Sequence, residues 1–201
     1  MKLYFAPGTC SLHPHIALLE AGQSFDLVRV DTRAHKTQDG TDYYTINPKG
    51  YVPALELDDG SVLTEGAVIS QYVADRKPES KLAPPAGTMD RYRLQEWLNF
   101  IASEIHKSFG VLFGNAPDEF KQQVRARIGG RFDLVSRTLE SSPYLLGSAF
   151  TVADAYLYNM LRWTRHTGIE LGKWPALTAF FARVDERPSV KKALEDEAPK
   201  R

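Results

Sequence analysis

Cys10, the only cysteine in the 201-residue chain, lies where a predicted strand gives way to a predicted helix. The strand spans residues 2–5, and Pro7-Gly8-Thr9 leads from it to a helix that begins near Ser11. A helix start offers unpaired backbone N–H groups and the positive end of the dipole, which favour a thiolate, either the protein's own or a substrate's. A lone cysteine is also commonly a small buried apolar residue, so its position alone leaves a structural role open.

A second group of chemically capable residues lies on a helix predicted over residues 89–113. At about 100° per residue, Asn99, Ser103, His106 and Gly110 form one polar stripe. These neutral groups are not the Lys and Glu of an ordinary solvated face. His106 is therefore a candidate acid/base or sulfur-orienting group, although a helical histidine is also often structural. The other side is predicted to be core: Trp97, Leu98, Ile101, Ile105 and Phe109.

The segment 47–53, Asn-Pro-Lys-Gly-Tyr-Val-Pro, precedes two alternating strands over residues 52–57 and 61–64 that form a predicted hairpin. A proline that opens an internal strand is awkward unless its geometry serves a purpose. A cis Val52–Pro53 bond would turn the backbone N–H and C=O of Val52 outward, where an extended peptide can pair with them. An edge proline without a ligand is the alternative.

These elements fall into two predicted domains. Residues 1–77 alternate between strand and helix signals in the order β-α-β, linker, β-β-α, which is that of a thioredoxin-like domain. The proline-rich residues 78–87 read as a linker, and residues 88–201 are helical almost throughout. In the second domain, Thr151 and Asp154 form a predicted capping box, a folding device and not a catalytic pair.

Composition limits the classes of function. The 25 basic and 25 acidic residues balance, so no charge excess directs the protein to nucleic acid or an anionic membrane. The first 80 residues hold 7 Lys and Arg against 11 Asp and Glu, about −4 net. The apolar start is too short for a signal peptide, and no stretch approaches a membrane span. A single cysteine excludes an internal disulfide, and the five histidines show no metal-ligand spacing. We expect a cytoplasmic protein without a metal.

The whole chain resembles the bacterial beta-class glutathione S-transferases. The resemblance rests on several independent segments: residues 1–4 (Met-Lys-Leu-Tyr), residues 7–12 (Pro-Gly-Thr-Cys-Ser-Leu), residues 47–55, residues 63–66 (Leu-Thr-Glu-Gly), residues 96–107 and residues 150–157. It implies a thioredoxin-like glutathione domain, an all-helical second domain that forms a hydrophobic substrate pocket, and a homodimer.

The resemblance also implies roles for individual residues. Val52 would pair through its backbone with the cysteinyl part of glutathione. Glu65 would hold the γ-glutamyl amine, and the N–H of Gly66 would take the γ-glutamyl carboxylate. Further contacts would come from the helical domain of the same or the partner subunit: Asn99 and Ser103 as polar contacts, and His106 and Lys107 facing the sulfur. In this class, Cys10 can form a mixed disulfide with glutathione.

Two positions bear on that chemistry. His13 stands three residues after Cys10, where a thioredoxin has its second cysteine, so an external thiol must resolve any disulfide on Cys10. Members of the class often have a lysine at position 35 for the glycyl carboxylate, whereas this chain has His35 followed by Lys36. Either residue can make that contact.

Three functions remain open at this stage. The first is transfer of the glutathione thiolate to a small hydrophobic electrophile, for which Cys10 and His106 are the catalytic candidates. The second is glutathione-dependent thiol-disulfide exchange or reductive dehalogenation through Cys10. The third is non-catalytic binding of hydrophobic ligands, which would require none of Cys10, Glu65 and His106.

Overall fold

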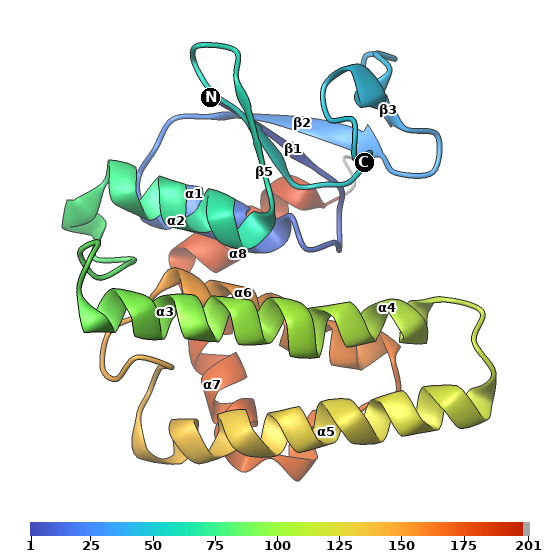
Figure 1. Cartoon of the computed structure of the whole chain (residues 1–201), viewed down its shortest axis with the longest axis vertical. Helices are drawn as coiled ribbons and strands as arrows, with labels where there is room; N and C mark the ends of the chain where they lie inside the picture. Colours follow the sequence, from blue (N-terminus) through green and yellow to red (C-terminus); the bar gives the residue numbers. More distant parts are fainter. Residues whose placement is uncertain (199–201) are drawn as a thin grey trace. The chain divides into compact units, whose positions relative to one another are not determined.

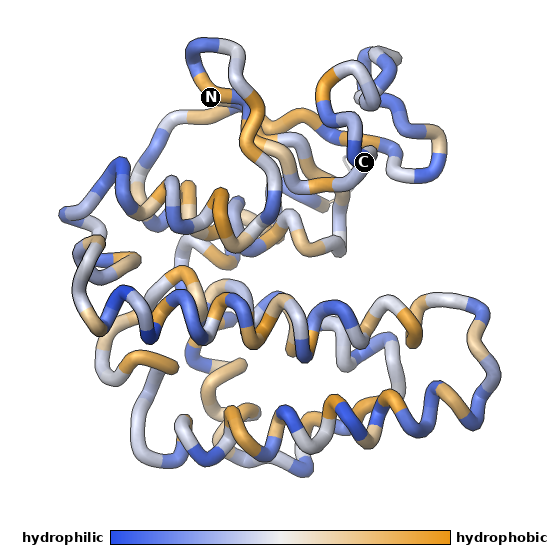
Figure 2. Tube along the Cα trace, viewed as in Figure 1, coloured by the Kyte–Doolittle hydropathy of each residue, from blue (hydrophilic) through white to orange (hydrophobic). Residues whose placement is uncertain are grey.

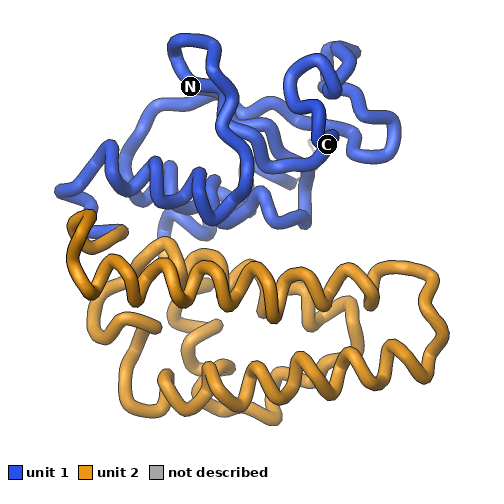
Figure 3. The backbone as a smooth tube through the Cα atoms, in the orientation of Figure 1, with its two compact units in different colours: residues 1–82, 188–201 blue, residues 83–187 orange. Residues whose placement is uncertain are grey.

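The computed structural model describes residues 1–198, which form two compact units (Figure 3). The first unit contains residues 1–82 and the segment from residue 188 onward, and the second contains residues 83–187. The predicted linker therefore lies at the boundary. The last helix, α8 (Pro188–Glu197), belongs to the first unit, whereas the sequence placed it in the helical domain.

The first unit is built on a five-stranded sheet with the order β3-β2-β1-β4-β5. Its strands are β1 (Lys2–Phe5), β2 (Asp26–Asp31), β3 (Lys36–Thr37), β4 (Ala54–Glu56) and β5 (Val62–Thr64). β1 and β2 are parallel, and the other pairs are antiparallel. The predicted strands and hairpin are confirmed. β3 was not predicted, because two residues are too few to show a periodicity.

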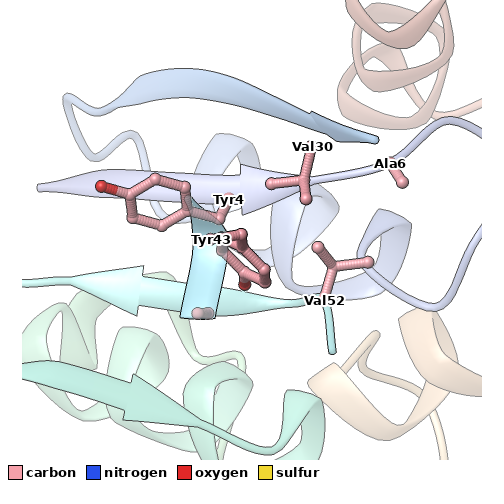
Figure 4. Packing of buried hydrophobic residues seen from close by; sticks show 6 residues of the cluster. Tyr4, Ala6, Val30, Tyr43 and Val52 are labelled. Atoms are coloured by element: carbon pink, nitrogen blue, oxygen red, sulfur yellow. The ribbon is translucent and has the colours of Figure 1, made fainter. Parts of the chain in front are cut away.

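Each face of the sheet is covered. Helices α1 (Leu12–Glu20), α2 (Gly66–Arg76) and α8 lie on one side (Figure 1). On the other side, alternate strand residues pack around Tyr43 of the short helix η1 (Tyr43–Thr45), as Figure 4 shows. The buried members of this cluster are Tyr4, Ala6, Val30, Tyr43, Val52 and Ala54. The packing places Val52, a predicted site residue, at the edge of a well-filled core.

The second unit is entirely helical among its described residues. It contains α3 (Met89–Phe100), α4 (Lys107–Phe113), α5 (Asp118–Ser141), α6 (Val152–Trp163) and α7 (Pro175–Asp185). Short helices lie at Pro78–Ser80 in the first unit and at Thr164–His166 and Leu171–Lys173 in the second. Along α5, hydrophilic and hydrophobic residues alternate as in an amphipathic helix (Figure 2). Its apolar stripe is buried, and α6 is buried from Val152 to Leu161.

The helix predicted over residues 89–113 is continuous but not uniform. Between α3 and α4 lies a π-helical segment, η3 (Ile101–His106), in which the N–H of Lys107 bonds to the carbonyl of Ala102, five residues back. The stripe predicted from regular α-helical spacing is therefore interrupted at Ser103 and His106. Of the predicted core residues, Trp97 is only half-buried and lines a groove with Phe100 and Leu134, and the other four are buried.

The predicted capping box at the start of α6 is confirmed. Asp154 is completely buried, and its carboxylate accepts three hydrogen bonds of 2.8 Å, from the N–H and hydroxyl of Thr151 and from the N–H of Leu145. Burial nevertheless raises the pKa of Asp154 to about 6. The carboxyl thus joins the start of α6 to the loop that precedes it.

Helix α8 is joined to α1 by buried polar contacts. The Nδ1 of His15 lies 3.1 Å from an oxygen of Glu197, and both side chains are almost completely buried. The hydroxyl of Ser189 donates to Glu20 at the other end of α8. These contacts explain why the last helix belongs to the first unit. No helix among residues 1–198 has both the length and the apolar character of a membrane span.

Candidate functional site

Cys10 lies in the turn between β1 and α1, two residues before the first residue of the helix. Its thiol is half-buried and donates to the carbonyl of Val52, with Sγ 3.4 Å from the oxygen. Burial raises the pKa of Cys10 to about 12, and the nearby negative charge of Glu65 adds to the effect. A backbone hydrogen bond acts in the opposite direction without cancelling the burial. Cys10 is therefore a neutral thiol at physiological pH, and the thiolate that a helix start would favour is not the protein's own.

The Val52–Pro53 peptide bond is cis, which is the geometry that the sequence left as one of two alternatives. Two hydrogen bonds hold the preceding loop: the hydroxyl of Tyr43 and the side-chain amide of Asn47 both donate to the carbonyl of Tyr51, at 2.9 and 2.7 Å. The backbone of Val52 is thus fixed directly beside the thiol of Cys10. The structure brings these two predicted site residues together.

Glu65 stands at the start of α2 with a φ of +69°, a value that residues other than glycine rarely adopt. Such conformations persist where the surrounding structure enforces them and are concentrated at binding sites. The Glu65 side chain is exposed, and one oxygen accepts from Nζ of Lys49 at 3.0 Å. Lys49 also donates to the hydroxyl of Thr64 at 2.9 Å. A predicted binding carboxylate is therefore oriented by a lysine to which the sequence gave no role.

Gly66, the first residue of α2, lies against the ring of His13. A Cβ at Gly66 would be 2.5 Å from Nε2 of His13 and 3.4 Å from Pro53. His13 is buried, and its Nδ1 lies 3.0 Å from the hydroxyl of Ser70 in the same helix. His13, which replaces the second cysteine of a thioredoxin motif, thus packs between α1 and α2 and requires a glycine at position 66.

His35 and Lys36 have different surroundings. The ring of His35, at a φ of +50°, stacks on Tyr44 with centroids 4.5 Å apart and lies next to Gly50. Its buried Nδ1 has no hydrogen-bond partner within the described part of the chain. Lys36 instead lines a pocket at the ends of β1 and β2. His35 therefore packs against Tyr44 and Gly50, in the segment that leads to Val52, whereas Lys36 lines a different pocket.

In the second unit, His106 is half-buried at the end of the π-helical segment. Its Nδ1 lies 2.6 Å from the hydroxyl of Tyr156 in α6. Trp163 meets the ring edge to face, with centroids 5.0 Å apart, and Phe109 and Phe113 pack against Trp163 in turn. Aromatic rings thus pack around a histidine whose Nδ1 is held by the hydroxyl of Tyr156.

The remaining predicted residues of this unit are exposed. The hydroxyl of Ser103 donates to the carbonyl of Asn99 at 2.9 Å, so its contribution to a ligand would come from its oxygen lone pairs. Lys107 is also exposed. Sequence reasoning missed the contact of Glu65 with Lys49, 16 residues away, and that of His106 with Tyr156. Spacing along the chain carries no signal for contacts over such separations.

Comparisons with known proteins agree with this geometry. Residues 8–76 match the N-terminal domain of glutathione S-transferases, and residues 94–188 match the C-terminal domain. The glutathione S-transferase GstA of Escherichia coli O157:H7 is 45% identical over 201 residues, which is all of both chains. The chain is a member of the glutathione S-transferase family.

Solved structures of this family superpose closely. BphK, a bacterial glutathione S-transferase solved as a ternary complex, has a TM-score of 0.96 at 54% identity, and the match covers 98% of this chain and 99% of BphK. The beta-class glutathione S-transferase of Sphingomonas chungbukensis has a TM-score of 0.95 at 45% identity, with 98% and 99% covered. The resemblance to the beta class and the thioredoxin-like plus helical fold are confirmed, and the protein is a glutathione-conjugating enzyme.

The described residues offer no group of three or more His, Cys, Asp or Glu side chains that could hold a metal ion. The polar groups around Cys10 are instead of the kind that bind a peptide: a backbone carbonyl, a carboxylate and a helix start.

Proposed function

We propose that this glutathione S-transferase binds glutathione on its first unit and transfers the thiolate to a small hydrophobic electrophile, with detoxification of such compounds as its role. The observation that carries the proposal is the contact between the Cys10 thiol and the Val52 carbonyl beside a cis proline. This contact places the thiol of Cys10 beside the backbone of Val52, with which the cysteinyl residue of glutathione would pair as an extended peptide.

The rest of the tripeptide would follow from that anchor. Glu65 would receive the γ-glutamyl amine, and Lys49 would keep its carboxylate in place. The first N–H groups of α2, at Gly66, would bind the γ-glutamyl carboxylate, because a helix start attracts anions. His35, whose ring borders Gly50, would meet the glycyl carboxylate instead of Lys36.

Catalysis would depend on stabilising the bound thiolate. On binding, the neutral Cys10 thiol would turn its one S–H from the Val52 carbonyl to this thiolate, whereas a Cys10 thiolate would repel it. His106, whose ring is held by the hydroxyl of Tyr156, would face the sulfur and favour its thiolate form. Lys107 would add positive charge, and Asn99 and Ser103 would add polar contacts from the same or the partner subunit of a cytoplasmic homodimer.

The test combines glutathione binding with conjugation of chlorodinitrobenzene. Glu65→Gln should weaken glutathione binding about tenfold, because a charge-assisted contact is lost. Glu79→Gln is the matched control, since Glu79 is equally exposed and pairs with Lys77 in the same unit. Equal affinities of the two variants would refute the assigned binding site, and no glutathione-dependent product with any electrophile tried would refute the transferase.

The exposed part of Cys10 favours a second candidate, a glutathione-dependent disulfide reductase or reductive dehalogenase. In the reductase, the sulfur of Cys10 attacks the glutathionyl sulfur of a mixed disulfide, and its proton passes to the other thiol as that thiol leaves. A second glutathione thiolate then attacks the glutathionyl sulfur of the Cys10 adduct, which forms oxidised glutathione and releases the Cys10 thiolate. Intact-mass measurement after incubation with oxidised glutathione tests the first step. A single adduct absent from Cys10→Ala supports it, and no adduct on the native protein contradicts it.

A further inference from the structure

The first unit contains a pocket of about 450 Å³ where β1 and β2 end. Its walls are the turn after β1, including Thr9, and the segment from Arg29 to Gln38. Cys10, Val52, Glu65 and His35 do not line it. The pocket is therefore separate from the groups to which we assign glutathione, and it requires an explanation of its own.

The lining of this pocket is rich in positive charge, although the first 80 residues of the chain carry a net negative charge. The first 80 residues have 7 Lys and Arg against 11 Asp and Glu. Three of those seven cations, Arg29, Arg33 and Lys36, line this pocket. The acidic residue among the lining residues is Asp31, and one of its oxygens already accepts from the N–H groups of Arg33 and Ala34 at 2.8 and 3.0 Å.

These three cations also differ from the other four in making no ion pair or hydrogen bond within residues 1–198, although Arg33 and Arg29 lie near enough to Asp31 to lower the pKa of its carboxyl. Lys2 pairs with Glu56, Lys49 with Glu65, and Lys77 with Glu79, while Arg76 bonds to Tyr72 and lies over its ring. The side chains of Arg29, Arg33 and Lys36 make no ion pair or hydrogen bond within residues 1–198. The unpaired cations of the first 80 residues are thus collected in one place.

We infer that this pocket binds a small molecule that carries two negative charges on oxygen, either a dicarboxylate or a phosphate ester. Two guanidinium groups offer forked donors that match carboxylate and phosphate oxygens, and Lys36 adds a third charge. Thr32 and Gln38 supply uncharged donors at the wall. The volume lies in the range of small-ligand sites. This inference goes beyond the proposed function, because it assigns a second ligand to the glutathione-binding unit.

Amide-resolved NMR titration of the whole protein tests the inference, with inorganic phosphate and succinate as separate probes and chloride at matched ionic strength as the reference. Saturable shifts are expected at Thr9, Arg33 and Thr37. Saturation with phosphate alone would identify a phosphate site, and saturation with succinate alone a dicarboxylate site. Shifts that rise linearly and match those of chloride would overturn the inference.

Variants locate the binding. Arg33→Gln should weaken the bound probe about tenfold through loss of a charge-assisted contact. Arg29→Gln is a second, independent variant for the same pocket. Arg76→Gln, which removes the same charge elsewhere in the unit, should leave the affinity unchanged. Equal weakening by Arg33→Gln and Arg76→Gln would show only general electrostatics and would contradict a built pocket.

Saturating glutathione separates this site from the proposed one. The probe should remain bound when glutathione is present, and Arg33→Gln should bind glutathione as the native protein does. Displacement of the probe by glutathione would overturn the inference of a separate site. Because the titration needs no glutathione, its result stands even if the proposed glutathione contacts fail.

Discussion

At Cys10, burial and the local backbone have opposite effects on the pKa of the thiol. The helix start favours a negative sulfur, but the desolvation of a half-buried thiol next to Glu65 disfavours it, and desolvation is the larger effect. The thiol therefore stays protonated and donates to Val52. A protonated Cys10 is suited to stabilise another thiolate and reacts slowly as a nucleophile itself.

The alkylation rate of Cys10 should reflect this raised pKa. Because the thiolate is the reacting form, the rate with iodoacetamide should still rise between about pH 9 and about pH 10, where a cysteine in a short unstructured peptide levels off. Intact mass gives a clean readout, since the chain has one cysteine. A plateau near or below the pH at which the peptide levels off would contradict the raised pKa.

The same shift has a consequence for stability. The unfolded chain loses the Cys10 proton near its ordinary pKa of 9.0, whereas the folded protein keeps it to about 12. The folded state therefore holds more protons in this window, and the stability that Cys10 contributes is lost as the pH rises through it.

Gly66 is required by a neighbour and not by its own backbone angles. The buried ring of His13, held by Ser70, occupies the space that a side chain would need. Gly66 thus leaves room for the ring of His13, and the same residue forms part of the proposed anion site.

Gly66→Ala should lower the free energy of unfolding by about 1–3 kcal/mol, because a methyl group would overlap the ring of His13. Gly130→Ala in α5 is the matched control. No atom lies within 4 Å of a Cβ there, so it should be neutral or stabilising by up to about 1 kcal/mol. Urea denaturation of both variants makes the comparison, and equal midpoints would show that His13 moves aside.

At the scale of elements, the π-helical segment is held from two sides. Glu104 accepts from Nε and a terminal nitrogen of Arg131 in α5, at 3.0 and 2.7 Å, while His106 meets Tyr156 in α6. The arginine keeps the pKa of Glu104 below its usual range. The segment is thus tied to α5 through Glu104 and to α6 through His106.

The capping box of α6 makes a prediction at the same scale. Asp154→Ala should lower the free energy of unfolding by about 2 kcal/mol, because it removes the cap and leaves the N–H of Leu145 unpaired. Asp118→Ala, in the exposed first turn of α5, should cost less than about 1 kcal/mol. Thermal unfolding of the two variants tests this, and similar losses would contradict a special role for Asp154.

The pH dependence of Asp154 has a definite sign. Its folded pKa of about 6 lies above the ordinary 3.8, so the folded protein holds this proton more tightly than the unfolded chain. The stability that the proton contributes is present below about pH 4 and is lost as the pH rises to about 6. The stability of the native protein relative to Asp154→Asn should therefore decrease over this interval, and a constant difference would show an ordinary carboxyl.

For the whole molecule, the last helix completes the first unit. Without α8, the buried His15 would lose Glu197, and the face of α1 that α8 covers would meet water. The thioredoxin-like order of residues 1–77 therefore does not describe an independent unit, because part of its core comes from the far end of the chain.

Truncation after Arg187 should destabilise the first unit before the second. Hydrogen exchange followed by mass spectrometry should show faster exchange in α1, whereas α5 keeps the protection of the full chain, since its packing lies within the second unit. Loss of protection in both helices to the same degree would show that the two units unfold together.

Much of the architecture follows from local signals. Alternating apolar residues predicted β1, β2 and the hairpin, and Thr151 and Asp154 predicted the start of α6. These features depend on backbone preferences and on residues a few positions apart, so the sequence by itself determined them. It also determined the family, through motifs in several separate segments.

Only the tertiary structure decided what depends on distant residues. The protonation of Cys10 depends on what covers it, and the contacts of Glu65 with Lys49, His106 with Tyr156 and His15 with Glu197 join separate elements. The gathering of Arg29, Arg33 and Lys36 likewise depends on how two strand ends meet. Desolvation and charge pairing act through space, and the spacing of residues along a chain does not specify which distant groups will meet.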